Sequence, residues 1–283
     1  AAVAKLPLGI VPAGSGNGLA LSILHRAGET WDVESMAYLI AKGGALPMDL
    51  LSMDSPSVEQ TFSFLSTEWA LASDIDITSE KYRCCGSFRF TCRALELVYC
   101  DGCVRNYSGA LHYLPVVEEG EAGGESKSAA PVDVEVGAGK GDKGRSNRSD
   151  SSSESDGGGG GVGGGGGPTG AARLIDTRTL LPAITEPIGD AHRARGWKTL
   201  EGGDWKYLWA MQTTHQASDS YGAPESKLGD GIVYICIAKD MSCCVPCKMT
   251  QWLLAMEDGT HLKMKDAQMI KCRAFRLEPQ NGI

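Results

Sequence analysis

The hydrophobic pattern at the start of the chain predicts a strand, a turn and two helices. Leu8 to Val11 is a short apolar run of strand length, and alternate glycines from Gly14 to Gly18 follow it. Apolar residues at helical spacing continue from Leu19. A second amphipathic pattern covers Val33 to Lys42, and the two glycines after it are typical of a helix end. We therefore predict part of an α/β unit, with Leu8 to Val11 as a buried strand.

From residue 46 the pattern changes to short segments of strand composition. They are residues 47–53, 61–66, 108–115, 207–213, 231–237 and 269–277. Helical patterns interrupt them over Glu80 to Val98 and over Lys248 to Met256, with Trp252 on the apolar side of the second. The prediction is a small α/β piece over residues 1–45, followed by a predominantly β domain over residues 46–283.

Residues 118–170 differ in composition, because acidic, Gly/Lys and Ser/Asp blocks there lead into a run of glycines. Such a segment has too few apolar residues to bury a core, so we predict a disordered insertion. Strand patterns resume after it, which places the insertion inside the β domain.

Composition and charge narrow the function classes. The net charge of -8 argues against non-specific nucleic-acid binding, and no apolar run approaches the length of a membrane span. Two Cys-x-x-Cys pairs, Cys100/Cys103 and Cys244/Cys247, lie far apart on opposite sides of the insertion. Reduced thiols are therefore favoured over a zinc site, and we predict no metal ligands.

The glycine turn is the first candidate binding site. Alternate glycines let the backbone approach a ligand, and the helix N-terminus that follows favours an anion. The spacing is not G-x-G-x-x-G, and no Lys-Ser/Thr follows as in a Walker loop. The turn therefore suits either a nucleotide phosphate or a plain connection between strand and helix.

Two pairs of charged residues are the next candidates. Asp74 and Asp76 lie in a segment predicted as strand or turn, where they could bind a metal, act as acid and base, hold an amine or cap a helix. Arg83 and Arg89 are six residues apart, so they share one narrow helical stripe only if a loop at Cys85 to Ser87 separates them. The alternative is that both are surface arginines.

Several motifs together resemble one enzyme family. They are Pro12 to Ala20, Ala72 to Arg83 with Gly86 to Phe90, Leu254 to His261, and Ala274 to Pro279. In sequence and order they resemble motifs of the sphingosine kinases, within the diacylglycerol-kinase-like lipid kinases. The resemblance implies a Rossmann-like nucleotide-binding domain, of which residues 1–45 are a remnant, and a mainly antiparallel β-sandwich that carries a lipid pocket. It also implies ATP as the phosphoryl donor, with Mg²⁺ bridging the phosphates.

The resemblance also implies which residues form the site. The nucleotide contacts are Gly14, Ser15, Gly16, Asn17, Arg83 and Arg89. The lipid contacts are Asp76, Ser66, Leu71, Ile75, Phe90, Met249, Trp252, Leu253 and His261. Asp76 would bind the amino-alcohol head of a sphingoid base, since a carboxylate paired with an ammonium is a strong contact. Glu68 departs from the family, which prefers a small apolar residue there. A buried unpaired carboxylate is costly, so either Glu68 faces outward or the pocket differs.

The family's catalytic base lies in a Ser-Gly-Asp-Gly motif, and no such motif precedes Gly9. The single Gly-Asp-Gly, at Gly229 to Gly231, comes far too late in the chain. The family's closing Asp-Gly-Glu motif would follow soon after Pro279. We therefore expect a fragment without the catalytic base, which cannot transfer phosphate by itself.

The leading hypothesis is part of an ATP-dependent kinase that phosphorylates the primary hydroxyl of a sphingoid base, converting sphingosine to sphingosine 1-phosphate. A ceramide or diacylglycerol kinase is an alternative that Asp76 distinguishes, because an amide or ester head group has no ammonium. A non-catalytic lipid-binding relative is the alternative from another class. The soluble composition, free cysteines and ATP donor predict a cytoplasmic protein. The insoluble substrate predicts transient, peripheral contact with membranes, for which the helix that carries Trp252 is a candidate. No nucleic-acid partner is expected, given the net charge.

Overall fold

The computed structural model describes residues 7–14, 16–86, 88–100, 104–116, 182–183, 186–241 and 244–280. All of them belong to one of the two units into which the chain divides, Ala1–Gly123 with Asp176–Ile283. The predicted insertion at residues 118–170 lies outside the described residues.

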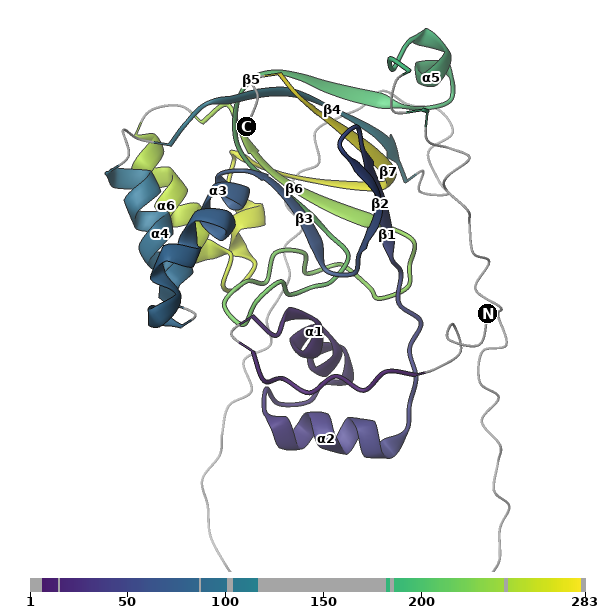
Figure 1. Ribbon diagram of the computed structural model, residues 1–283, viewed down its shortest axis with the longest axis vertical. Coiled ribbons are helices and arrows are strands. Elements are labelled where there is room, and N and C mark those ends of the chain that lie inside the picture. Colours follow the sequence, from purple (N-terminus) through teal and green to yellow (C-terminus); the bar gives the residue numbers. More distant parts are fainter. Residues whose placement is uncertain are drawn as a thin grey trace, which may run out of the picture. The chain divides into compact units, whose positions relative to one another are not determined.

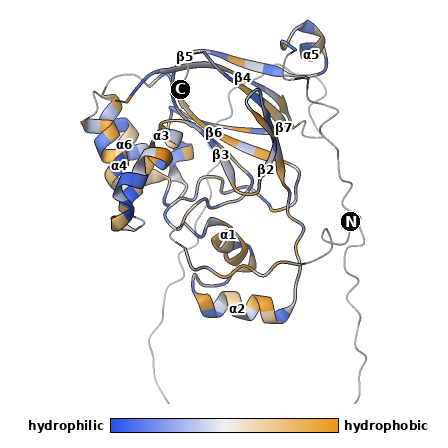
Figure 2. Ribbon diagram, in the orientation of Figure 1, coloured by the Kyte–Doolittle hydropathy of each residue, from blue (hydrophilic) through white to orange (hydrophobic). Residues whose placement is uncertain are grey.

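Helices α1 (Gly18–Ala27) and α2 (Val33–Lys42) confirm the two helices predicted at the start of the chain. The Asp32 side chain accepts a hydrogen bond from the Ser35 N–H at 2.6 Å, and Gly43, at φ 77°, ends α2. Figure 2 shows hydrophobic as well as hydrophilic positions on α2, and Tyr38 on this helix is 54% exposed.

The predicted buried strand at Leu8 to Val11 is wrong. This segment forms no strand, and Leu8 is 78% exposed. An apolar run becomes a strand only when another strand pairs with it, and no described strand pairs with this segment. The helices of the predicted α/β piece are therefore present in the described residues, whereas its strand is not.

In the part of the chain that the structure describes, seven strands form two antiparallel sheets. They are β1 (Leu51–Ser55), β2 (Val58–Ser63), β3 (Ser66–Ala70), β4 (Tyr107–Pro115), β5 (Lys198–Met211), β6 (Val233–Lys239) and β7 (Ala267–Pro279). β1 and β2 make a hairpin, and the other five follow the order β3-β5-β4-β7-β6 with a further pairing of β5 to β6. This last pairing closes β5, β4, β7 and β6 into a ring (Figure 1). The predicted antiparallel architecture is confirmed, with one sheet that folds back on itself.

Strand β5 makes this fold possible because its two halves have different partners. Its first half pairs with β4, and its second half pairs with β3 and β6. The register shifts between Trp205 and Tyr207, which interrupts the alternation of the two faces. Trp205 and Leu208 therefore pack in one hydrophobic cluster, whereas Tyr207 and Met211 pack in another.

The helices after β3 differ from the prediction of one helix over Glu80 to Val98. Three elements occupy this region: α3 (Leu71–Thr78), the 3-10 segment η2 (Ser79–Cys85) and α4 (Phe88–Tyr99). Gly86, at φ 60°, separates η2 from α4, so the break that was predicted as one possibility between Arg83 and Arg89 is present. Asp74 and Asp76 lie in α3, not in a strand or turn.

The remaining helices follow the insertion. They are α5 (Asp190–Ala194), α6 (Val245–Ala255) and the 3-10 segment η4 (Thr260–Lys263). α6 matches the second helix predicted in the β domain, and α4 packs against α6.

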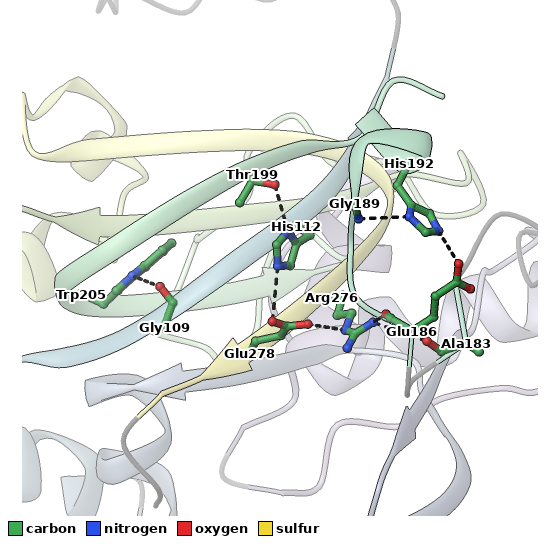
Figure 3. Close-up of polar contacts among 10 residues, drawn as sticks. All are labelled: Gly109, His112, Ala183, Glu186, Gly189, His192, Thr199, Trp205, Arg276 and Glu278. Atoms are coloured by element: carbon green, nitrogen blue, oxygen red, sulfur yellow. Dashed lines mark hydrogen bonds and ion pairs between the residues drawn. The ribbon is translucent and has the colours of Figure 1, made fainter. Parts of the chain in front are cut away.

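A polar network joins the segment before α5 to strands β4 and β7 (Figure 3). His112 Nδ1 is 2.9 Å from Thr199 Oγ1, and His112 Nε2 is 3.6 Å from a carboxylate oxygen of Glu278. The other oxygen of Glu278 is 2.8 Å from Arg276 Nε, and Arg276 donates to the carbonyl of Glu186 at 2.5 Å. His112 lies opposite Thr199 of β5 and Arg276 of β7 in the sheet register, so its contacts with Thr199 and Glu278 cross between strands. The contact of Arg276 with the Glu186 carbonyl fixes the segment before α5 to the sheet.

Candidate functional site

A cavity of about 570 Å³ lies among β3, β5 and the helices α3, α4 and α6. The loop after β5 also lines the cavity, through Gln216, Ala217, Asp219 and Ser220. Gly16 of the glycine turn lines it as well. Residues far apart in the sequence therefore form one concave surface, which is the usual form of a small-molecule site.

Strand alternation forms the first wall of the cavity. Ser66 and Glu68 of β3 line it, as do Tyr207 and Trp209 of β5. Glu68 lies directly opposite Trp209 in the register of the two strands, so both side chains project to the same face of the sheet. Trp69, the next residue of β3, packs into the hydrophobic cluster on the other face.

Helical spacing forms the other walls. α3 contributes Ala72, Ile75 and Asp76, which are spaced i, i+3 and i+4 and so share one face of the helix. α4 and α6 contribute mostly apolar side chains at similar spacing. They are Phe90, Thr91, Ala94, Leu95 and Val98 from α4, and Thr250, Leu253 and Leu254 from α6. The cavity therefore combines long apolar walls with carboxyl groups, those of Glu68 on β3 and Asp76 on α3 and those of Asp219 and Glu257 in turns.

The geometry separates the two aspartates that the sequence left equivalent. Asp74 accepts a short hydrogen bond from the Tyr107 hydroxyl and lies 4.0 Å from Arg105. Asp76 is two residues further along α3 and lines the cavity instead. Asp74 is thus engaged by protein groups, whereas Asp76 lies at the cavity surface.

Glu68 faces the cavity, so of the two alternatives for this residue the structure supports a pocket that differs from the family pattern. Burial and the nearby Asp76 carboxylate raise the pKa of Glu68 to about 8. The Trp209 indole N–H lies close to the Glu68 carboxyl group and opposes part of this rise in pKa. This N–H makes no hydrogen bond of normal geometry with the described residues. Glu68 is therefore mostly protonated near neutral pH, which avoids the cost of a second buried charge and makes it a hydrogen-bond donor.

The predicted lipid-binding residues fall into two groups. Ser66, Ile75, Asp76, Phe90 and Leu253 line the cavity. Leu71, Met249, Trp252 and His261 are buried in the packed layer behind it.

Trp252 shows what this second layer does. Its ring is fully buried and lies 5.4 Å from the His261 ring and 6.1 Å from the Tyr207 ring, measured between centroids. Tyr207 itself lines the cavity, so Trp252 and His261 support a lining residue from behind. A fully buried Trp252 is incompatible with the predicted membrane-contact role of its side chain.

The glycine turn is closed by Asn17, which has a left-handed backbone with φ 55°. Gly14 N–H donates to Asn17 Oδ1 at 2.9 Å, and Asn17 Nδ2 donates back to the Gly14 carbonyl at 2.5 Å. Gly16 has open space around its Cα, but a Cβ on Gly18 would lie 2.3 Å from the Gln216 carbonyl oxygen. Gly18 is therefore required by packing of the protein on itself, while Gly16 remains accessible. Ser15 lies outside the described residues.

The two arginines share an ion-pair partner but not a location. Arg83 and Arg89 both pair with Glu80. The Arg83 side chain is 79% exposed, whereas that of Arg89 is 14% exposed and lies over the Phe90 ring at 4.4 Å. Arg89 lines the cavity, and its buried Nε has no hydrogen-bond partner among the described residues. The structure thus brings Arg89 to the site and leaves Arg83 at the surface.

Sequence reasoning missed Trp209, Tyr207 and the loop residues Gln216, Asp219 and Ser220, which also line the cavity. The alternation of β5 could have indicated Tyr207 and Trp209 together, since they are two residues apart in a strand pattern. The loop had no local pattern, because its place depends on contacts with the distant helix α1, such as the 3.0 Å hydrogen bond from His215 N–H to Ser22 Oγ.

The described residues contain neither a cluster of metal ligands nor a membrane-spanning helix. None of them form a group of three or more His, Cys, Asp or Glu side chains that could hold a metal ion. Among the helices that the structure describes, none is long and apolar enough to cross a membrane.

Comparison with known proteins shows that the chain is similar to sphingosine kinases. No protein-family model matches the chain. It is 27% identical to sphingosine kinase 1 of Arabidopsis thaliana over 97% of its own length and 46% of that protein. It is 29% identical to human sphingosine kinase 1, over 98% of the chain and 60% of the relative. It is also 29% identical to sphingosine kinase 1 of Caenorhabditis elegans, over 96% of the chain and 55% of the relative.

The predicted resemblance to the sphingosine kinases is therefore confirmed over nearly the whole chain. The chain spans about half the length of the curated relatives that it matches.

Proposed function

We propose that this chain contributes the lipid pocket, and part of the nucleotide site, of an ATP-dependent kinase that phosphorylates the primary hydroxyl of a sphingoid base. The observation that carries the proposal is the cavity in which apolar walls from α4 and α6 meet the carboxyl groups of Asp76 and Glu68. A sphingoid base has the matching parts, an alkyl tail and a head that carries an ammonium next to hydroxyls. The similarity to sphingosine kinases supports the same substrate class.

Asp76 is the residue that selects an amine. Its carboxylate would pair with the ammonium in a partly dry cavity, where such a charge-assisted contact is strong. A ceramide or a diacylglycerol has no ammonium, so this contact favours a sphingoid base over both. Glu68, mostly protonated near neutral pH, would donate a hydrogen bond to a head-group hydroxyl without competing for the positive charge.

The nucleotide would lie against the glycine turn and Arg89. The buried, unpartnered Nε of Arg89 fits a phosphate oxygen, and Gly16 leaves space for one. ATP with bound Mg²⁺ would supply the phosphoryl group, and no described residue is assigned as a metal ligand. Arg89 would orient the phosphates and offset their charge.

Access to an insoluble substrate requires contact with a membrane surface. Phe88, Leu95 and Leu254 are 59%, 46% and 61% exposed, and Leu95 and Leu254 also line the cavity. These apolar side chains, rather than Trp252, would make the transient peripheral contact that admits the lipid.

The test is a comparison of two matched variants, Asp76→Asn and Asp74→Asn, in a sphingosine-binding assay with the purified chain. Asp76→Asn should weaken sphingosine binding about 10-fold to 100-fold, because it removes a charged partner worth about 1.5–3 kcal/mol. Asp74→Asn should leave the affinity within about twofold, since Asp74 is engaged by Tyr107. Ceramide binding should respond to neither change.

Circular dichroism of both variants controls for folding. Sphingosine affinity that is the same in Asp76→Asn as in the unmodified chain would reject the assignment of the head group to this cavity. A ceramide affinity that falls in parallel with that for sphingosine would favour a different lipid class.

A further inference from the structure

The start of helix α6 carries two cysteines in close contact. Cys244 is the N-cap residue and Cys247 lies in the first turn, with Val245 and Pro246 between them. Both side chains are free and exposed, and their sulfur atoms are 2.6 Å apart. Side chains three residues apart in a regular helix have Cβ atoms about 5–6 Å apart. The non-helical backbone of Cys244, with φ 29° and ψ 53°, is what brings its sulfur over Cys247.

The two thiols are chemically unequal. Hydrogen bonding with Cys247 lowers the pKa of the Cys244 thiol, while the same contact raises the pKa of the Cys247 thiol. The free N–H groups at the start of a helix also favour a thiolate there. Cys244 therefore has the character of an attacking thiolate, with Cys247 as the second thiol of the pair.

Other cysteines in the described residues lack this combination. Cys236 and Cys272 are buried, and burial raises the pKa of both thiols. Cys84 and Cys85 are exposed neighbours, but their sulfur atoms are 3.9 Å apart, and contact with Cys84 raises the pKa of Cys85. The pair at α6 is thus distinguished by sulfur contact and by its place at the N-terminus of an 11-residue helix.

We propose that Cys244 and Cys247 are a redox-active pair that a small-molecule disulfide, such as oxidised glutathione, converts into an intrachain disulfide that alters the cavity wall. Cys244 loses its proton to solvent, and its thiolate attacks one sulfur of the oxidant and releases a thiolate that solvent protonates, leaving a mixed disulfide on Cys244. Cys247 then loses its proton to solvent, and its thiolate attacks the Cys244 sulfur and releases the second thiol. The protein gives up two electrons and two protons, and the oxidant is reduced to two thiols.

Helix α6 connects this pair to the cavity. Thr250 lines the cavity, and its Oγ1 donates to the carbonyl of Pro246 at 2.9 Å, inside the turn between the two cysteines. The same Oγ1 is 2.8 Å from the hydroxyl of Tyr99 at the end of α4, the helix that forms the facing wall. A disulfide requires the sulfur atoms to approach by about 0.5 Å more and to adopt a fixed torsion, which moves this turn. The coupling to lipid binding rests on the proposed function, whereas the reactivity of the pair does not.

The first experiment equilibrates the full chain in glutathione buffers of graded redox potential, blocks free thiols and maps disulfides by mass spectrometry. We expect a Cys244–Cys247 crosslink that forms at buffers at least tenfold more reducing than any Cys84–Cys85 crosslink. Cys247→Ser should instead hold a stable glutathione adduct on Cys244, and the matched control Cys84→Ser should leave the crosslink unchanged. Cys244 and Cys247 remaining thiols in buffers that already modify the exposed Cys100 would overturn the proposal.

The second experiment measures binding of a fluorescent sphingoid base to the reduced and the oxidised chain. Oxidation should change the Kd at least threefold, and Cys244→Ser, which cannot form the crosslink, should show the same Kd under both conditions. An equal Kd in both states, with the crosslink mapped, would overturn the coupling to the cavity. Absence of lipid binding in both states would contradict the proposed function and the coupling with it, and disulfide mapping would still decide whether the pair is redox-active.

Discussion

Two tryptophans four residues apart on β5 have opposite hydrogen-bonding environments. The Trp205 indole N–H donates to the carbonyls of Gly109 at 3.2 Å and Gly202 at 2.9 Å (Figure 3 shows the first). The Trp209 indole nitrogen is also buried but makes no hydrogen bond of normal geometry with the described residues. A hydrogen-bonded buried donor contributes to stability, so the indole N–H stabilises the fold at Trp205 and contributes little at Trp209.

The same difference separates the polar network of β4 and β7 from the cavity. His112, Arg276 and Glu278 contact one another or nearby backbone, which fixes a segment to the sheet. Arg89 and Trp209, which line the cavity, each have a buried nitrogen without a hydrogen-bond partner. Paired polar groups thus stabilise one region, while two residues that line the cavity each keep a buried nitrogen that no described residue pairs.

The largest expected effect in this comparison is that of Trp205→Ala. Trp205 is fully buried, so truncation removes its packing and its two hydrogen bonds to carbonyls, at a cost of about 3–5 kcal/mol in the free energy of unfolding. Urea denaturation of the purified chain measures the change. Trp209→Ala is the matched variant and should cost clearly less, because its side chain is only partly buried and its N–H is unpaired. Equal losses of unfolding free energy in Trp205→Ala and Trp209→Ala would contradict the proposed difference between the two tryptophans.

Local signals made part of the fold predictable. Helix α2 was predicted with its observed bounds because its cap at Asp32 and its ending glycine act within a few residues of the helix. The run at Leu8 carried no comparable information, since a strand depends on a distant partner. The start of α3 at Leu71 was equally hidden, because the burial of Leu71 and Ile75 against other elements stabilises this short helix.

The residues that line the cavity were less predictable from the sequence than the helices. Spacing alone could not choose between Asp74 and Asp76, because the choice depends on the phase of α3 and on Tyr107, which lies 33 residues away. The resemblance pointed to Asp76, and the cavity contains it. The sequence marks Glu68 as unusual, but which face of the sheet its side chain projects from depends on the pairing of β3 with β5. Long-range pairing therefore decides what the sequence pattern leaves open.

The second prediction concerns the pH dependence that Glu68 gives the cavity. Its pKa is raised from 4.5 to about 8 in the folded chain, so the folded state binds more protons than the unfolded state between these values. The stability that the folded state gains from holding this proton is fully present below pH 4.5 and is lost as the pH rises toward 8. The free energy of unfolding falls over this range by at most about 1.4 kcal/mol per pH unit. Glu68→Gln keeps the shape and removes the titration. Urea denaturation from pH 5 to pH 8 should therefore show a flatter profile for Glu68→Gln than for the unmodified chain. Parallel profiles would mean that Glu68 is ionised in the folded chain.

The smallest effect on stability, and the sharpest test of the comparison, is that of Trp209→Phe. Phenylalanine keeps most of the ring but removes the unpaired N–H, so the free energy of unfolding should change by less than about 0.5 kcal/mol. Trp205→Phe, the matched control, leaves the carbonyls of Gly109 and Gly202 without their donor and should cost about 1–2 kcal/mol.

The effects of the same two variants on sphingosine binding should follow the reverse order. Sphingosine affinity should fall about threefold to tenfold in Trp209→Phe, because a ligand hydroxyl loses a donor, and should stay within twofold in Trp205→Phe. If Trp209→Phe instead destabilises the chain as much as Trp205→Phe and binds sphingosine normally, the Trp209 N–H serves the fold, and the cavity loses its main unsatisfied donor.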